Sequence, residues 1–323
     1  MSDDLLQIEG MVVTLHARGG DQEIVHGIDL HVVSGETLGV VGESGSGKTL
    51  TMLSVMRLLA PPLEMTQGSV RLEGLDLTSL PEPEMRQVRG NRVAMVYQDP
   101  MTSLNPLMRI GDQVVESMTA HGVPKDEAWP RALATLARVE MPDPERTATA
   151  YPHELSGGMR QRALIATGLA MDPTLLIADE PTTALDVTIQ RQILALVKHL
   201  SDESKMTTVW VTHDLGVIAR LVDRVVVMYG GYVVEDAPVD QIFHAPQHPY
   251  TQRLLQSLPN PADDSRPPLA MIPGRPPLPS EIVEGCPFRP RCVAARDVCL
   301  TRPELEPRLD GRVACWVPVE GRG

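Results

Sequence analysis

The most specific chemical pattern in the chain is a glycine-rich loop at residues 42–49, which read GESGSGKT. The spacing fits G-x-x-x-x-G-K-[ST], whose backbone N–H groups curl around phosphate oxygens at the positive N-terminal end of a helix. We expect Lys48 to reach the β- and γ-phosphates and the Thr49 hydroxyl to ligate Mg²⁺. The loop predicts nucleotide binding, against the alternative of a glycine-rich turn that matches by chance. The other predicted phosphate-binding residues are Gly42, Ser44, Gly45 and Gly47.

Two acidic residues end an apolar run at 175–180, which reads LLIADE. Asp179, at the end of the predicted strand, is expected to lie beside the Mg²⁺ ion. Glu180 follows at the next position and can polarise a water in line with the γ-phosphate. A surface acidic pair at a strand-to-turn junction is the alternative interpretation. Beside the phosphate loop, the pair predicts nucleotide hydrolysis.

A third motif, LSGGMRQR at 155–162, begins an amphipathic helix. Ser156 and the backbone of Gly157 and Gly158 form a second anion-binding pattern at a helix N-terminus. One complete phosphate loop is enough for one nucleotide, so we expect this site to serve the nucleotide of a second chain. The alternative is a serine-capped helix behind a Gly-Gly turn.

These motifs need strands and helices to position them, and the sequence alternates the two. Helical patterns at 49–60, 189–200 and 214–222 separate most of the apolar runs, which predicts a mostly parallel sheet covered on both faces. Between 99 and 172 the pattern changes to helices and turns, which we interpret as a helical insertion. The predicted strands are the runs at 35–41, 92–97, 174–179, 207–213 and 224–231.

With these motifs in this order, residues 1–240 resemble the ATP-binding cassette (ABC) ATPases. The resemblance implies an α/β nucleotide-binding domain with a mostly parallel sheet, an N-terminal β part and a helical subdomain at about 99–172. It also implies that two subunits sandwich two ATP molecules, with Ser156 facing the partner's γ-phosphate. By the same resemblance, Gln98 senses Mg²⁺ and the attacking water, Asp186 lies in the loop after Glu180, and His213 contacts the γ-phosphate. The expected Mg²⁺ ligands are Thr49, Gln98 and Asp179.

Two positions depart from the family pattern. Met159 stands where the commonest form of the signature has Gln, a variant that resembles the one in peptide-importer ATPases. Near the position of the usual adenine-stacking aromatic the chain has only Leu15 and His16, so that contact stays unassigned.

The last part of the chain, 241–323, has a different composition and is expected to be a separate C-terminal extension. The segments HPYT at 248–251 and IPGRPP at 272–277 resemble the tail of dipeptide and oligopeptide importer ATPases. Nickel-importer ATPases share much of this pattern. The resemblance favours peptide uptake and leaves a nickel or other solute importer of the same branch as the alternative.

All four cysteines lie in this extension, with gaps of five, six and fifteen residues: Cys286, Cys292, Cys299 and Cys315. A cytosolic chain rarely keeps two disulfides, so a metal site or reduced thiols is the more natural interpretation. Four thiolates suit either Zn²⁺ or an iron–sulfur cluster, and none of the gaps is the two-residue spacing common in zinc sites. The resemblance to dipeptide importers implies a [4Fe–4S] cluster, with zinc and unliganded or oxidised thiols as alternatives.

Composition limits the classes of function. The chain has 323 residues, 42% apolar, and a net charge of −13, which argues against nucleic acid as the main partner. No apolar run approaches the roughly 18–20 residues that span a bilayer, and we expect no secretory signal. The resemblance to peptide-importer ATPases then implies a peripheral subunit on the cytoplasmic face of the membrane. It would work with a second, related ATPase chain, two permease subunits and, through that complex, a solute-binding protein. The alternatives from other classes are an ABC ATPase in DNA maintenance and a metal-sensing regulatory subunit.

Overall fold

The computed structural model describes residues 4–182, 185–258, 272–278, 281 and 284–319, and these form two compact units. Each unit combines segments that are distant in sequence. The first contains Val33–Glu36 and Ser79–Trp210, and the second contains Asp4–Val32, Thr37–Thr78 and the described residues from Val211 on. Both mix helices with strands, as the predicted α/β class requires.

The first unit is built on short, buried parallel strands. Strand β6 (Val93–Val96) pairs in parallel with β7 (Leu175–Asp179), and β8 (Thr207–Thr212) lies next to β7. Every residue of β6 and β7 is buried, the continuous apolar pattern of a strand that is covered on both faces. The predicted strands at 92–97, 174–179 and 207–213 are therefore confirmed to within one or two residues.

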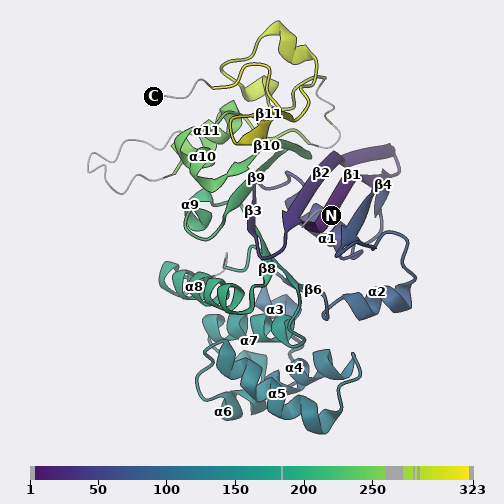
Figure 1. Ribbon diagram of the computed structural model, residues 1–323, viewed down its shortest axis with the longest axis vertical. Coiled ribbons are helices and arrows are strands. Elements are labelled where there is room, and N and C mark those ends of the chain that lie inside the picture. Colours follow the sequence, from purple (N-terminus) through teal and green to yellow (C-terminus); the bar gives the residue numbers. More distant parts are fainter. Residues whose placement is uncertain (1–3, 183–184, 259–271, 279–280, 282–283, 320–323) are drawn as a thin grey trace. The chain divides into compact units, whose positions relative to one another are not determined.

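Helices make up most of the rest of this unit, and α4 to α7 gather into one cluster (Figure 1). In α5, the buried residues Ala128, Ala132, Thr135 and Leu136 recur every three or four positions, so one stripe of the helix faces its neighbours. The helices are α2 (Glu82–Val88), α3 (Pro100–Ser103), α4 (Ile110–Thr119), α5 (Lys125–Arg138), α6 (Pro144–Thr149), α7 (Gly157–Leu169) and α8 (Val187–Ser204). The segment predicted to be helical between 99 and 172 thus contains α3 to α7.

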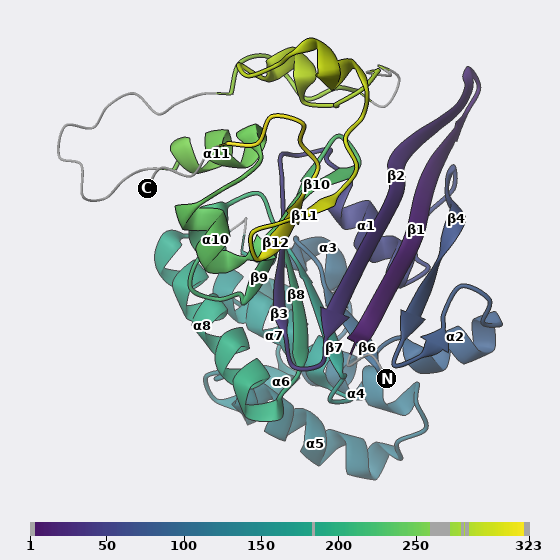
Figure 2. The ribbon, with the colours of Figure 1, turned by 45° about the horizontal axis from the view of Figure 1, so that its top comes forward.

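The second unit contains an antiparallel sheet whose long strands β1, β2 and β4 lie side by side in Figure 2, in the order β2-β1-β4-β5. Its strands are β1 (Asp4–Ala17), β2 (Gly20–Val33), β4 (Leu63–Leu72) and β5 (Leu75–Asp76). This sheet is the N-terminal β part that the family resemblance implied.

A second set of strands in this unit runs in the order β11-β12-β10-β9-β3, with β3 and β9 parallel and the rest antiparallel. Strands β11 and β12 belong to the C-terminal extension, which therefore adds two strands beside β10. These strands are β3 (Thr37–Val41), β9 (Arg224–Tyr229), β10 (Tyr232–Pro238), β11 (Glu306–Arg308) and β12 (Gly311–Val313). The helices are α1 (Lys48–Val55), α9 (Leu215–Ile218), α10 (Val239–His244) and α11 (Pro249–Gln256).

Two predicted helices are shorter than their apolar patterns suggested. The helix expected over 49–60 ends at Val55, because Arg57 adopts a left-handed conformation with φ of 51° that a helix cannot continue through. The helix expected over 214–222 is confined to α9, with Asp214 as its N-cap. None of the described helices combines the length and apolar character needed to cross a membrane.

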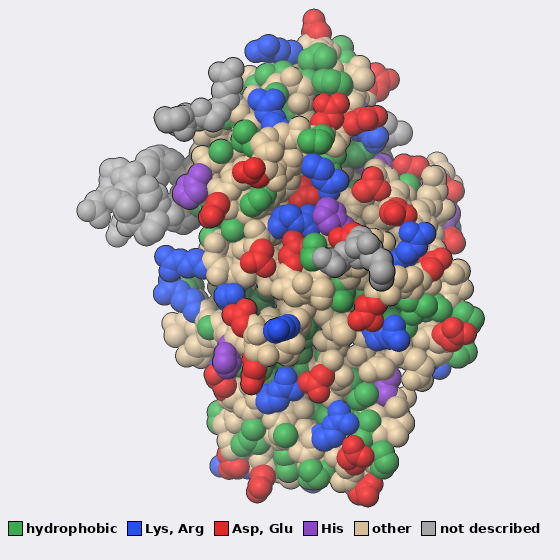
Figure 3. Space-filling view, in the orientation of Figure 1, with side chains coloured by type: hydrophobic (Ala, Val, Ile, Leu, Met, Phe, Trp, Pro, Cys, Tyr) green, Lys and Arg blue, Asp and Glu red, His purple; other side chains and the backbone are tan. Residues whose placement is uncertain are grey.

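The visible surface carries acidic and basic side chains interspersed among apolar ones (Figure 3). Among the described residues on this face, no continuous basic patch is seen, which agrees with the acidic balance of the sequence.

Candidate functional site

The phosphate loop connects β3 to α1 and is shaped by glycines that approach other backbone. Gly42 has φ of +155°, and a Cβ at this position would lie 2.1 Å from the carbonyl oxygen of Met228 on β9. Gly47, with φ of +99°, is the N-cap of α1. A side chain at Gly42 would force the loop away from β9, and a Cβ at Gly47 would lie 3.1 Å from Cγ2 of Val25 on β2. Both residues also have a positive φ, which favours glycine.

Lys48 lies inside the loop rather than in solvent. Its side chain is buried, and Nζ donates to the carbonyl oxygens of Gly42 at 2.8 Å and Glu43 at 3.0 Å. A buried ammonium must be compensated by acceptors, and phosphate oxygens are stronger acceptors than carbonyls. The loop thus holds a cation ready for an anionic ligand. Thr49 follows at the exposed edge, together with Ser44 and Gly45.

The structure brings two of the predicted catalytic residues together in the first unit. Gln98 Nε2 donates a hydrogen bond of 3.1 Å to Glu180 Oε2. Asp179, the last residue of β7, is buried, and Glu180 directly after it has φ of 46°. A left-handed glutamate is an uncommon conformation that costs about 1–3 kcal/mol and is often found at functional sites. Two adjacent carboxylates therefore lie at the end of β7, and the second of them is on a residue with a strained backbone.

Ser156 of the 155–162 motif and Asp186 each cap a helix N-terminus of the same unit. The Ser156 side chain caps α7 by accepting from the N–H of Met159, and Asp186 caps α8 by accepting from Thr188 and Ile189. Gly158 allows α7 to approach α8 closely, because a Cβ at this position would lie 2.8 Å from Cγ2 of Ile189, whereas a Cβ on Gly157 would make only an ordinary contact with Leu185 at 3.5 Å.

His213 follows β8 and belongs to the second unit, as does the phosphate loop, whereas Gln98, Glu180, Ser156 and Asp186 belong to the first. The predicted site residues are thus divided between the two units. His213 itself is partly exposed.

The four cysteines are free thiols that line one cavity, together with His248, Phe288 and Arg289. Burial, with a smaller contribution from the neighbouring thiols, raises the pKa of the Cys315 thiol to about 12; burial also raises the pKa of Cys286 and Cys292. Within the described part of the chain, no group of three or more His, Cys, Asp or Glu side chains has the arrangement that holds a metal ion.

Two polar atoms of the same cavity are buried without a hydrogen-bond partner. They are Nε2 of His248 and Nε of Arg289. A buried polar atom without a partner costs about 1–3 kcal/mol, so an acceptor in this cavity would relieve that cost. Four thiols and an unpartnered guanidinium N–H fit an anionic thiolate-bound group.

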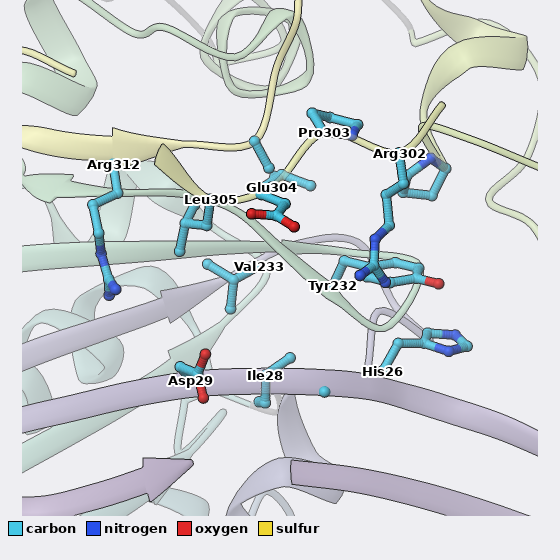
Figure 4. Close-up of a pocket in the computed structure, with 14 residues that line it drawn as sticks. His26, Ile28, Asp29, Tyr232, Val233, Arg302, Pro303, Glu304, Leu305 and Arg312 are labelled. Carbon is cyan, nitrogen blue, oxygen red and sulfur yellow. The ribbon is translucent and has the colours of Figure 1, made fainter. Parts of the chain in front are cut away.

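A second cavity lies between β2, β10 and the C-terminal extension (Figure 4). His26 stacks on Tyr232 with ring centroids 4.3 Å apart, and Arg302 lies over the same tyrosine ring at 5.0 Å. None of the predicted site residues lines this cavity. No motif marks it, because its residues come from three segments with ordinary spacing.

Comparisons with known proteins agree with the geometry. Residues 25–183 match the family described as ABC transporter, and residues 234–299 match the family described as oligopeptide/dipeptide transporter, C-terminal region. A probable peptide ABC transporter ATP-binding protein of Sinorhizobium fredii is 47% identical over 98% of this chain and 95% of its own length. The oligopeptide transport ATP-binding protein OppD of Salmonella typhimurium is 44% identical over 98% of this chain and 94% of its own.

Among solved structures, the chain is similar to a dimeric post-hydrolysis state of the ATP-binding cassette MJ0796 bound to ADP and Pi. The TM-score is 0.65 at 28% identity, covering 72% of this chain and 98% of that one.

Proposed function

This chain belongs to the ABC transporter family of ATP-binding subunits, and from that premise we propose that it hydrolyses ATP to energise the import of dipeptides or oligopeptides. The C-terminal match and the similarity to peptide-import proteins over almost the whole chain support this substrate class. In this proposal residues 1–240 form the ATPase domain, with 99–172 as its helical subdomain, and 241–323 form the C-terminal extension.

The hydrogen bond between Gln98 and Glu180 is the observation that best supports a hydrolytic role. This amide donor fixes the direction of the Glu180 carboxylate, and a general base must be positioned in this way to reach a water. We assign Glu180 as the residue that polarises the attacking water and Gln98 as the residue that positions it. His213 would contact the γ-phosphate.

The remaining predicted residues bind the nucleotide and its metal. The loop glycines, Ser44 and Lys48 would hold the phosphates. Thr49, Asp179 and Gln98 supply the oxygen ligands that Mg²⁺ prefers. Ser156, Gly157 and Gly158 would face the γ-phosphate held by a second ATPase subunit, and Asp186 lies at the N-terminus of the adjacent helix.

The transport path belongs to other subunits in this proposal, which places the chain at the cytoplasmic face of the membrane. Two permeases would bind the helical subdomain, a second, related ATPase would complete the dimer, and a solute-binding protein would deliver the peptide to that complex. Two large apolar side chains of this subdomain support a docking surface: Met101 is 55% exposed and Leu107 is 85% exposed. A permease that covered these two side chains would remove their apolar surface from water.

The four cysteines of the extension would hold a [4Fe–4S] cluster. The shared cavity, the absence of disulfides among these four residues and the unpartnered Nε of Arg289 fit such a group. When bound, a cluster of this kind can carry one electron or cross-link the segments that hold it. Arg289 would donate a hydrogen bond toward it, and the surrounding burial would exclude water.

The hydrolytic assignment is tested by Glu180→Gln in the complex purified with its partner ATPase and permeases. We expect ATP binding to persist while turnover falls by about 10²-fold or more, because the phosphate-binding residues remain and the base is lost. ATP-bound dimers should accumulate in size-exclusion chromatography. Turnover equal to that of the unaltered complex would remove Glu180 from this role, and an unaltered complex without ATPase activity would contradict the proposed function.

A further inference from the structure

The second residue of the phosphate loop, Glu43, is held by two residues of the C-terminal extension. Its backbone N–H donates to the hydroxyl of Tyr250 at 2.8 Å. Its carboxylate accepts two hydrogen bonds from the guanidinium of Arg291, from Nη1 at 2.6 Å and Nη2 at 3.0 Å. The extension therefore holds both the backbone and the side chain of this loop residue.

Arg291 is fixed in place by contacts on every side. Its side chain is only 6% exposed, and Nε donates to the carbonyl of Pro273 at 2.8 Å. Nη1 also donates to the hydroxyl of Tyr229 at 3.2 Å, and Nη2 to the carbonyl of Ile272 at 3.3 Å. A planar fork of donors held this way fits a carboxylate in only one geometry, so Arg291 specifies where Glu43 lies.

Tyr250 is equally constrained. It is fully buried, and its ring lies 4.6 Å from that of Tyr229 and 5.3 Å from that of Phe288, centroid to centroid. Tyr229 is the last residue of β9. The residue before it, Met228, lies against Gly42 of the loop. Tyr229, Tyr250 and Phe288 thus form an aromatic cluster next to the phosphate loop, in a chain with only 3% aromatic residues.

The position of Glu43 bears directly on the lysine of the loop. Lys48 Nζ donates to the carbonyl oxygens of Gly42 and Glu43, so moving Glu43 moves two of the acceptors that place the ammonium. We propose that Arg291 and Tyr250 are positioning residues of the phosphate loop, which set its conformation for nucleotide binding from the C-terminal extension. This proposal rests on the proposed ATPase function, and neither residue contacts the reacting atoms in it.

The first test is Arg291→Gln in the full-length chain, with ATP affinity measured by calorimetry and steady-state ATPase kinetics. We expect the Kd and KM for ATP to rise about tenfold while kcat changes by less than about threefold, because the loop loses its preset shape and the catalytic carboxylate is untouched. Arg291→Lys keeps the charge without the fork, so it should restore only part of the affinity.

A double-mutant cycle with Glu43→Gln separates this contact from general loss of structure. If Arg291 and Glu43 act through each other, the double variant should bind ATP no more weakly than the weaker-binding single variant, because either single change already removes the Arg291–Glu43 contact. Tyr250→Phe removes only the hydroxyl that accepts from the Glu43 N–H and should raise the Kd for ATP several-fold. Arg275→Gln is the matched control: its exposed ion pair with Glu281 lies in the same extension, and its ATP affinity should be unchanged.

Unchanged or tighter ATP binding in folded Arg291→Gln and Tyr250→Phe variants would overturn the proposal, as would independent effects that add in the double variant. If Arg291→Gln fails to fold, Arg291→Lys and Tyr250→Phe still decide the outcome. An unaltered chain that binds no ATP would instead contradict the proposed function, so the two failures are distinguishable.

Discussion

At the scale of single residues, hydrogen bonds orient two of the side chains proposed for ATP chemistry. Gln98 orients the Glu180 carboxylate through an amide donor, and backbone carbonyls hold the Lys48 ammonium in the loop. These hydrogen bonds fix where the carboxylate and the ammonium lie before a nucleotide binds, which lowers the cost of ordering them on binding.

The cysteine cavity leads to a residue-scale prediction. Anaerobically purified protein should be brown, with the broad visible absorbance of an iron–sulfur cluster, and Cys286→Ser should lose that colour because one of four thiolate ligands is removed. Ultraviolet–visible spectroscopy with iron and sulfide analysis makes the measurement. Glu180→Gln is the control and should stay brown.

A bound Zn²⁺ ion would be recognised by its lack of visible absorbance. Colourless protein that contains stoichiometric zinc would overturn the cluster assignment in favour of a four-thiolate zinc site.

Residue motifs were the part that sequence could predict best. The loop at 42–49 and the carboxylates at 179–180 use fixed local spacing, so their positions at the ends of β3 and β7 follow from the chain itself. The pairing of Glu43 with Arg291 joins positions 248 residues apart, and no local pattern encodes it. HPYT was identified only as a family marker, and the role of its tyrosine needed the fold.

At the scale of elements, buried strands were predicted more accurately than helix ends. Continuous apolar runs located β6, β7 and β9, because a strand covered on both faces has little choice of composition. The end of α1 depends on the left-handed backbone of Arg57, which the apolar pattern does not encode. The two strands that the extension adds beside β10 are short and mostly exposed, so they lacked an apolar signal.

The contact between β2 and β10 makes stability depend on pH. Burial lowers the pKa of His26, which stacks on Tyr232, and nearby Arg302 lowers it further, whereas Glu23 opposes the shift. The unfolded chain therefore binds a proton below about pH 6.5 that the folded chain resists, so stability is present above this pH and is lost as the pH falls toward the lowered pKa. His26→Phe keeps a ring and removes the titration.

We expect His26→Phe to reduce the loss of unfolding free energy between pH 7 and pH 5 by at most about 2 kcal/mol, measured by urea denaturation at each pH. Because the difference between two pH values is measured, any constant packing cost cancels. His16→Phe is the control of opposite sign, since hydrogen bonding to Asp21 raises the pKa of that exposed histidine. Identical pH profiles for His26→Phe and the unaltered chain would contradict the assignment.

At the scale of the whole molecule, the residues proposed for ATP chemistry are divided between the two units. The phosphate loop and His213 lie in one, and Glu180, Gln98 and Ser156 lie in the other. The extension, which marks the peptide-transporter branch, is part of the unit that holds the phosphate loop and contacts that loop directly. The tail is thus physically connected to nucleotide binding and is more than an appended segment.

The most direct test of the central claim is affinity purification of this chain from gently solubilised native membranes, followed by mass spectrometry. We predict two multi-span permeases, a second ABC ATPase and a solute-binding protein that carries peptide. Recovery should fall with Leu107→Asp, which places a charge on the proposed docking surface. A preparation that lacks membrane proteins and contains DNA-maintenance or redox proteins instead would contradict the assignment as an importer ATPase.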